Sequence, residues 1–277
     1  MSGDFLAAMA RASRERVAAA RARVPDAALA TRARAAAAAP PLVLDGRFDL
    51  IAELKLRSPA QGAFGASPDS LEARVSAYAR AGAASVSVLT EPERFDGDLG
   101  HLARASAALA PLCVPTMRKD FLVDPYQLLE ARAAGAGGAL LIVRMLPRAE
   151  LEALLAAAAS LGLFVLLEAF DADDVGIAAA LAARWPGPRA ACLIGVNSRD
   201  LATLKVVPGR LDALASLLPA AYPRVAESGL ATAADAARLA RAGYTLALVG
   251  SALMSEEDPA PLARAMLDAG RATGRPA

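Results

Sequence analysis

The chain has 277 residues, of which 56% are hydrophobic, and its 30 Lys and Arg nearly balance its 29 Asp and Glu. This apolar content is enough for a large core, and the near-zero net charge excludes a strongly basic nucleic-acid-binding protein. Two cysteines and one histidine exclude a disulfide scaffold, a CxxC zinc site and a His-rich metal site.

The N-terminal segment carries Asp4 and several arginines and lacks the compact apolar stretch of a secretory signal. No window of about 18 strongly apolar residues occurs elsewhere, so no transmembrane span is predicted. We therefore expect a cytoplasmic protein that contacts neither membranes nor nucleic acid. A transit peptide is the alternative for the N-terminus.

Residues 1–48 are expected to form a helical extension. Phe5, Met9 and Val17 lie in an arginine- and alanine-rich background, a pattern typical of an amphipathic helix. Pro40-Pro41 then ends the helical stretch. We expect this helix to cap one mouth of the domain that follows, with a partner-binding helix as the alternative.

From residue 49 to residue 270, short apolar runs alternate with alanine-rich segments. The runs are almost continuously apolar, as expected of parallel strands buried on both faces. They span 50–55, 85–89, 114–118, 139–143, 164–168, 192–196, 224–227 and 246–249. Eight such units predict a single α/β domain, a closed (β/α)₈ TIM barrel, followed by a tail over 271–277. An open doubly wound sheet is the alternative, but it would more often carry a GxGxxG motif after its first strand.

Local signals mark the helix ends. Gly82, Gly135, Gly162 and Gly243 each follow an alanine- or leucine-rich run, where a helix C-cap favours glycine. Asp124, just before Pro125, predicts an N-cap followed by proline at the first helical position.

Polar residues cluster where the predicted strands end, which is where TIM barrels carry their active sites. The strand ends supply Glu53, Lys55, Ser58, Lys119, Glu168, Asn197, Arg199, Glu227, Ser228, Gly229, Gly250 and Ser251. A barrel needs only stability at this face, so such a density of polar groups favours an enzyme. His101 and Cys113, away from these positions, are expected to be structural.

The charged residues of the first and third strands each allow two interpretations. Glu53 and Lys55 are two apart and face the same way; they serve either chemistry or a structural ion pair, which would be a poor source of stability because burial costs desolvation. Lys119 is either catalytic or part of a solvated charge cluster. Strand alternation argues against the cluster, because it sends Lys119 and Arg118 to opposite faces.

The later strand ends suggest proton transfer and anion binding. Glu168 ends an apolar strand, a position suited to a general acid or base, with a hydrogen bond to a loop as the alternative. The turns "ESGL" and "VGSAL" combine glycine, which lets the backbone approach a ligand closely, with serine hydroxyls and helix N-termini. They predict a phosphate site, with ordinary strand-to-helix turns as the alternative.

Seven segments together resemble the indole-3-glycerol phosphate synthase family. They are, in order, "IAELKLRSP", "VLTEPERFDG", "RKDFLVDPYQLLEARAAGA", "LLIV", "GVNSRDL", "VAESGL" and "LVGSALM", and the resemblance covers about residues 4–260. It implies a carboxy-lyase of tryptophan biosynthesis that converts 1-(2-carboxyphenylamino)-1-deoxy-D-ribulose 5-phosphate into indole-3-glycerol phosphate, CO₂ and water. It implies no metal and no organic cofactor, and leaves a monomer or a homodimer open.

The resemblance also implies residue roles. Lys119 would be the general acid in ring closure, Glu168 the general base in dehydration and Lys55 a second acid. Glu53, Asn197 and Glu227 would orient the substrate and the lysines. Ser58, Arg199, Ser228, Gly229, Gly250 and Ser251 would hold the phosphate, and Phe95, Phe121 and Leu140 would enclose the anthranilate ring. Burial is expected to let the lysines donate protons near neutral pH by lowering their pKa.

Two positions depart from the family pattern. Leu56 stands where a basic residue is usual, and Ala60 replaces the second serine of "SPS". Both lie in the loop after the first strand, where they could alter substrate binding or loop closure. A phosphoribosyl-anthranilate isomerase is a weaker alternative. Members of that family carry a cysteine at the end of the first strand, whereas the first strand here ends in Glu53 and Lys55. A non-catalytic homologue, or one from secondary metabolism that binds a related phosphorylated ligand, is the other alternative.

Overall fold

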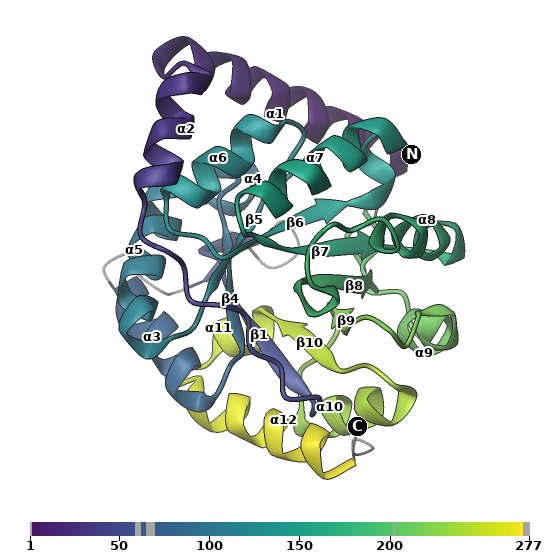
Figure 1. Cartoon of the computed structure of the whole chain (residues 1–277). Helices are drawn as coiled ribbons and strands as arrows, with labels where there is room; N and C mark the ends of the chain where they lie inside the picture. Colours follow the sequence, from purple (N-terminus) through teal and green to yellow (C-terminus); the bar gives the residue numbers. More distant parts are fainter. Residues whose placement is uncertain (1, 59–61, 65–69, 202, 274–277) are drawn as a thin grey trace.

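The computed structural model describes residues 2–58, 62–64, 70–201 and 203–273, and Ala60 lies outside them. In the described part, eight parallel strands close into a barrel in the order β1-β4-β5-β6-β7-β8-β9-β10 and back to β1 (Figure 1). The strands are β1 (Asp49–Leu54), β4 (Ser85–Leu89), β5 (Thr116–Lys119), β6 (Gly138–Ile142), β7 (Phe164–Ala169), β8 (Cys192–Asn197), β9 (Arg224–Glu227) and β10 (Leu246–Val249). The predicted TIM barrel is confirmed.

Several strand ends are shifted by one residue from the prediction, and two features differ more. β5 begins at Thr116 rather than at residue 114, because Pro115 has no N–H to donate to a ladder. A short antiparallel pair, β2 (Arg57–Ser58) and β3 (Gly62–Ala63), follows β1 and was not predicted.

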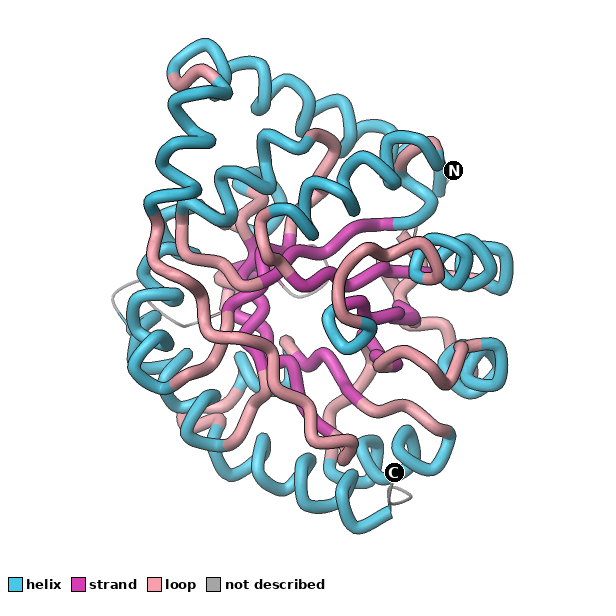
Figure 2. Tube along the Cα trace, viewed as in Figure 1, coloured by secondary structure: helices cyan, strands magenta, loops and turns pink. Residues whose placement is uncertain are grey.

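Helices surround the barrel (Figure 2). They are α3 (Leu71–Ala81), α4 (Pro92–Phe95), α5 (Leu99–Leu109), α6 (Pro125–Ala133), α7 (Arg148–Ser160), α8 (Ala172–Ala182), α9 (Arg210–Leu214), α10 (Ala233–Ala242), α11 (Ser251–Ser255) and α12 (Ala260–Thr273). The four predicted C-cap glycines all have positive φ, from 69° at Gly162 to 102° at Gly82 and Gly243. Asp124 caps α6 by accepting a hydrogen bond from the Tyr126 N–H, as predicted. The predicted tail begins inside α12, where Arg271 binds Asp49 at 2.6 Å.

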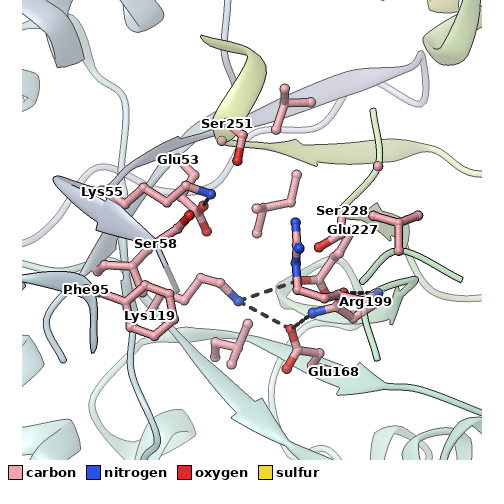
Figure 3. Close-up of a pocket in the computed structure, with 18 of the residues that line it drawn as sticks. Glu53, Lys55, Ser58, Phe95, Lys119, Glu168, Arg199, Glu227, Ser228 and Ser251 are labelled. Carbon is pink, nitrogen blue, oxygen red and sulfur yellow. Dashed lines mark hydrogen bonds and ion pairs between the residues drawn. The ribbon is translucent and has the colours of Figure 1, made fainter. Parts of the chain in front are cut away.

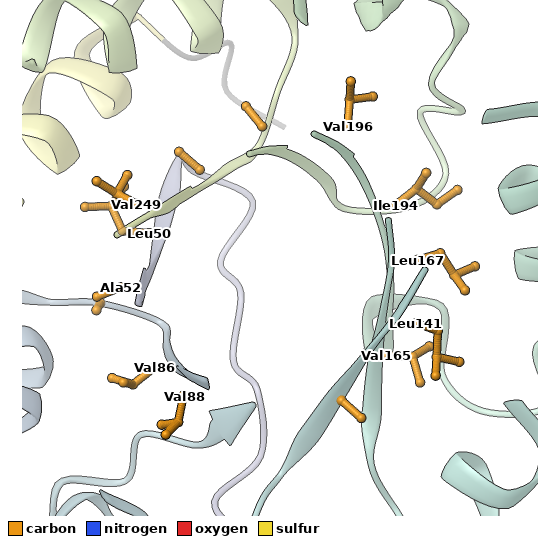
Figure 4. Packing of buried hydrophobic residues seen from close by; sticks show 14 of the residues in the cluster. Leu50, Ala52, Val86, Val88, Leu141, Val165, Leu167, Ile194, Val196 and Val249 are labelled. Carbon is orange, nitrogen blue, oxygen red and sulfur yellow. The ribbon is translucent and has the colours of Figure 1, made fainter. Parts of the chain in front are cut away.

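Strand alternation divides the core into two layers. Outward-facing side chains such as Leu50, Val165 and Ile194 pack beneath the helices (Figure 4). Inward-facing ones such as Leu166 and Leu193 fill the barrel. Because each strand is apolar on both faces, the strands read as continuous apolar runs.

The N-terminal extension comprises α1 (Ser2–Arg23) and α2 (Asp26–Ala35), which lie along one side of the barrel beside α6 (Figure 1). Met9 and Val17 on α1 are each 4% exposed, which confirms the amphipathic helix. The segment 36–48 crosses the N-terminal mouth of the barrel, where Leu42 and Leu44 pack against the inner layer (Figure 2). No helix of the described residues is long and apolar enough to cross a membrane.

Candidate active site

The inner layer becomes polar at the C-terminal ends of the strands. Continuing the inward-facing register, β1 presents Glu53, β5 Lys119, β7 Glu168, β8 Asn197 and β9 Glu227. These side chains line a cavity of about 390 Å³ (Figure 3). The barrel therefore concentrates its inward polar groups in one cavity at the C-terminal ends of the strands.

Every site residue predicted from the sequence lines this cavity. Besides the five above, the lining includes Lys55, Ser58, Phe95, Phe121, Leu140, Arg199, Ser228, Gly229, Gly250 and Ser251. His101 lies in α5, and Cys113 is an exposed residue; neither lines the cavity. In the part of the chain that is described, no group of three or more His, Cys, Asp and Glu is placed to hold a metal ion.

Lys119 is the centre of the polar cluster. Its Nζ lies 3.3 Å from Glu168 Oε1 and 3.7 Å from Glu227 Oε2, and Asn197 Nδ2 donates to the same Glu168 oxygen at 2.9 Å (Figure 3). Arg118 points the other way and donates to the Gln127 carbonyl oxygen at 2.7 Å. The alternation argument is thus confirmed, and Lys119 is not part of a solvated cluster.

The electrostatics of Lys119 correct the expectation of a lowered lysine pKa. Burial alone would lower the pKa of Lys119, but the nearby carboxylates of Glu168, Glu227 and Glu53 together outweigh it and raise this pKa. The prediction is wrong for Lys119 in the substrate-free site because it counted burial and left out the carboxylates from other strands.

A second ion pair lies across the cavity. Lys55 Nζ donates to Glu53 Oε1 at 2.8 Å, and both side chains are at most 10% exposed. Burial raises the pKa of Glu53, but the charges of Lys55 and Lys119 outweigh burial and lower it. The pair is therefore an ion pair and also part of the cavity wall.

Two glycines make room for the buried carboxylates. A Cβ at Gly195 would overlap Glu227 Oε1, and a Cβ at Gly250 would overlap Glu53 Oε1. Sequence reasoning assigned Gly250 only to the phosphate turn and did not single out Gly195. The available signal was a glycine in the interior of the apolar strand "CLIGVN". Glycine weakens a strand, so its presence there often marks a place where another group approaches the backbone closely.

One end of the cavity is suited to an anion. Ser228 and Gly229 both have positive φ, 67° and 78°, and Ser251 begins α11. Successive residues of this kind turn backbone N–H groups toward a common point. The Arg199 guanidinium lines the cavity too and is held by a 2.5 Å hydrogen bond from Nη1 to the Leu204 carbonyl oxygen.

Apolar residues form the remaining walls. Phe121 contacts Phe95 and Phe5, with ring centroids 6.5 and 5.9 Å apart. Sequence reasoning placed Phe5 in the amphipathic N-terminal helix and did not include it in the site. Sequence reasoning also missed three apolar residues of the loop after β8 that line the cavity, Leu201, Leu204 and Val206. The available signal was several hydrophobic residues close together in a segment expected to be a loop.

Helix α1 positions the loop that carries Phe121. The buried Ser13 hydroxyl donates to the Phe121 carbonyl oxygen at 2.5 Å and accepts from Gln127 Nε2 at 2.9 Å. Arg16 Nη2 binds Asp120 Oδ1 at 2.8 Å. The extension therefore holds the residues that directly follow Lys119.

Comparison with known proteins agrees with this geometry. A family model described as "Indole-3-glycerol phosphate synthase" matches residues 6–266. The chain is 43% identical over 217 residues to the indole-3-glycerol phosphate synthase of Nocardioides sp., covering 78% of this chain and 79% of that protein. It is 40% identical over 261 residues to that of Rhizorhabdus wittichii, covering 92% and 94%.

Solved structures support the fold alone. 3-Hexulose-6-phosphate synthase from Salmonella typhimurium aligns with a TM-score of 0.61 at 12% identity, covering 82% of this chain and all (100%) of that one. The tryptophan synthase alpha subunit from Legionella pneumophila aligns with a TM-score of 0.55 at 15% identity, covering 80% and 92%. The match over residues 6–266 goes further than fold, and the chain belongs to the indole-3-glycerol phosphate synthase family.

Proposed function

We propose that this cavity closes the indole ring of 1-(2-carboxyphenylamino)-1-deoxy-D-ribulose 5-phosphate, with Lys119 as the general acid. The observation that carries the proposal is the position of Lys119, whose charged amine is held by Glu168 and Glu227 beside the wall formed by Phe121. A charged amine next to an apolar ring pocket supplies a proton where charge develops during ring closure.

The other residues divide the remaining steps. Phe95, Phe121 and Leu140 orient the flat anthranilate ring against the ribulose carbonyl. Lys55 protonates the departing hydroxyl during dehydration, and Glu168 removes the proton that dehydration releases. Glu53, Asn197 and Glu227 orient the lysines and the substrate, with no step that requires a metal or an organic cofactor.

The substrate phosphate binds at the end of the cavity with the positive-φ turn. Arg199 supplies a charge-assisted hydrogen bond, and the hydroxyls and amides of the two turns supply the others; the remaining residues are Ser58, Ser228, Gly229, Gly250 and Ser251. Arg199→Ala is expected to raise KM about 10- to 100-fold, the equivalent of about 1.5–3 kcal/mol, with a smaller effect on kcat. An unchanged KM would remove Arg199 from the phosphate site.

The proposed molecule is a cytoplasmic enzyme whose catalytic domain is the barrel over 49–270, active as a monomer or a homodimer. It binds a phosphorylated small-molecule substrate and binds neither nucleic acid nor a membrane. Its nearest alternative is a non-catalytic or secondary-metabolism homologue. Retention of both Lys119 and Glu168 disfavours the non-catalytic form.

A fluorescence assay tests the reaction. The purified protein, given the carboxyphenylamino-deoxyribulose phosphate in the presence of EDTA, should produce indole fluorescence. Lys119→Ala should abolish product formation while substrate still binds. Lys205→Ala, an exposed lysine on the loop after β8, is the matched control and should keep wild-type turnover. Binding without product in the wild type would favour the non-catalytic homologue.

A further inference from the structure

The buried cluster holds more carboxylates than ammonium groups. Lys55 pairs with Glu53 at 2.8 Å, which leaves Lys119 to Glu168 and Glu227 together, at 3.3 and 3.7 Å. All three carboxylates are at most 4% exposed. Glu168 and Glu227 therefore share a single ion-pair partner in a space walled by protein, where a carboxylate without a full partner is costly.

Glu227 is where this imbalance is concentrated. Its side chain is 1% exposed, and neither of its carboxylate oxygens accepts a hydrogen bond from a donor among the described residues. Glu168 lies on the same side of the cavity, because both carboxylates contact the Nζ of Lys119, at 3.3 and 3.7 Å. Two ionised carboxylates offer only acceptors, so a hydrogen bond between them requires a proton.

The charges around Glu227 agree with a bound proton. Burial is the largest cause, the charge of Glu168 the second, and together they raise the pKa of Glu227 well above its ordinary value despite Lys119. The charged groups that line the same cavity are Glu53 on β1, Lys55 after β1, Lys119 on β5, Asp120 after β5, Glu168 on β7 and Arg199 after β8.

We propose that Glu168 and Glu227 share one proton in the substrate-free enzyme, and that this proton replaces the one that Lys119 gives to the substrate. The second half rests on the proposed function of the site. The first half concerns the empty enzyme and stands without it.

The stoichiometry of the reaction calls for such a proton. In ring closure the ring carbon bonds to the ribulose carbonyl carbon, and the carbonyl oxygen takes a proton from Lys119. CO₂ then leaves, and the electron pair of the broken bond restores the aromatic ring. In dehydration the hydroxyl leaves as water with a proton from Lys55, while Glu168 takes a proton from the methylene next to nitrogen. Two protons are donated and one is recovered, so each turnover consumes one proton.

Transfer of the shared proton would reset two groups at once. Glu227 would return a proton to the neutral amine of Lys119, which restores its ammonium group. Glu168 would then be an ionised carboxylate with no proton between it and Glu227, free to act as the base in dehydration. Because Glu168 becomes an available base only after this transfer, dehydration would follow ring closure.

Infrared spectroscopy of the substrate-free enzyme tests the shared proton directly. At neutral pH the wild type should show a protonated carboxylic acid band above the amide I region, shifted by isotope labelling of glutamate. Glu227→Gln and Glu168→Gln should each lose it, because each leaves one carboxylate facing Lys119. Glu150→Gln, on the exposed part of α7, is the control and should keep it. Absence of the band in the wild type, or its survival in either active-site variant, would overturn the proposal.

Kinetics test the use of the proton. Glu227→Gln should lower kcat about 100-fold or more, the usual range for loss of a proton-transfer group, while KM stays near the wild-type value. Glu227→Asp retains a carboxyl and should recover part of kcat. A Glu227→Gln enzyme that loses the infrared band but keeps wild-type kcat would show that the proton is stored and not used, and would overturn the second half. If the wild type itself lacked activity, the proposed function would fail while the infrared result still stood.

Discussion

The strand glycine Gly195 offers a sharp test of how the barrel positions its carboxylates. Gly195→Ala would place a Cβ over Glu227 Oε1 and 2.9 Å from Leu166 Cδ1. Carbon atoms pack best at about 3.5–4.0 Å, so Leu166 must retreat by about 0.6 Å or more. Leu166 is fully buried on β7, and the adjoining strands leave little space for it.

The expected effects are a modest loss of stability and a large loss of turnover. Overpacking a filled core costs about 1–3 kcal/mol, which urea unfolding would measure. Displacing Glu227 by about 1 Å next to Lys119 should lower kcat on the order of 100-fold, measured by the indole fluorescence assay. The loss of activity should therefore exceed what partial unfolding explains.

Gly176→Ala is the matched control. Gly176 lies on α8, and a Cβ there meets nothing within 4 Å. Because glycine is unfavourable inside a helix, this variant should gain up to about 1 kcal/mol of stability and keep wild-type kcat. A Gly195→Ala enzyme with wild-type kcat would refute the argument that this glycine sets the place of Glu227.

Three further predictions concern other parts of the molecule. Ser13→Ala removes the buried hydroxyl that holds the Phe121 loop, so it should lower the free energy of unfolding in urea by about 1–3 kcal/mol and also lower kcat/KM. The control is Arg14→Ala on the same helix, which breaks an exposed ion pair worth at most about 1 kcal/mol. Equal effects of the two variants would show that the hydroxyl has no special role. A thiol reagent at mildly alkaline pH should label exposed Cys113 but not Cys192 before unfolding, since burial raises the pKa of Cys192 to about 12; labelling of both in the native protein would contradict this burial. Because the pKa of Glu227 is raised, the folded state holds its proton more tightly than the unfolded state, and stability falls as pH rises from the unfolded pKa, about 4.3, to the folded one. The Tm of Glu227→Gln should therefore exceed that of the wild type by a margin that grows over this range, and a margin independent of pH would contradict the raised pKa.

Much of this protein follows from signals that act over a few residues. Apolar runs on both strand faces predict a parallel barrel, and the glycines after four of the helices predict left-handed backbone there, as at Gly82 and Gly243. The two-residue alternation of a strand is enough to send Lys119 inward and Arg118 outward. Because parallel strands all end on one face, the predicted residues from different strands had to meet there.

Tertiary structure decided what those residues experience once they meet. The pKa of Lys119 is raised, against the expectation from burial, because carboxylates arrive from β1, β7 and β9. Gly195 matters because Glu227 of the neighbouring strand fills the space above it. Phe5 becomes a cavity wall because α1 lies beside the loop after β5. A local pattern fixes the direction of a side chain, but its electrostatic energy and packing depend on distances to groups that are remote in the sequence, and only the closed barrel sets those distances.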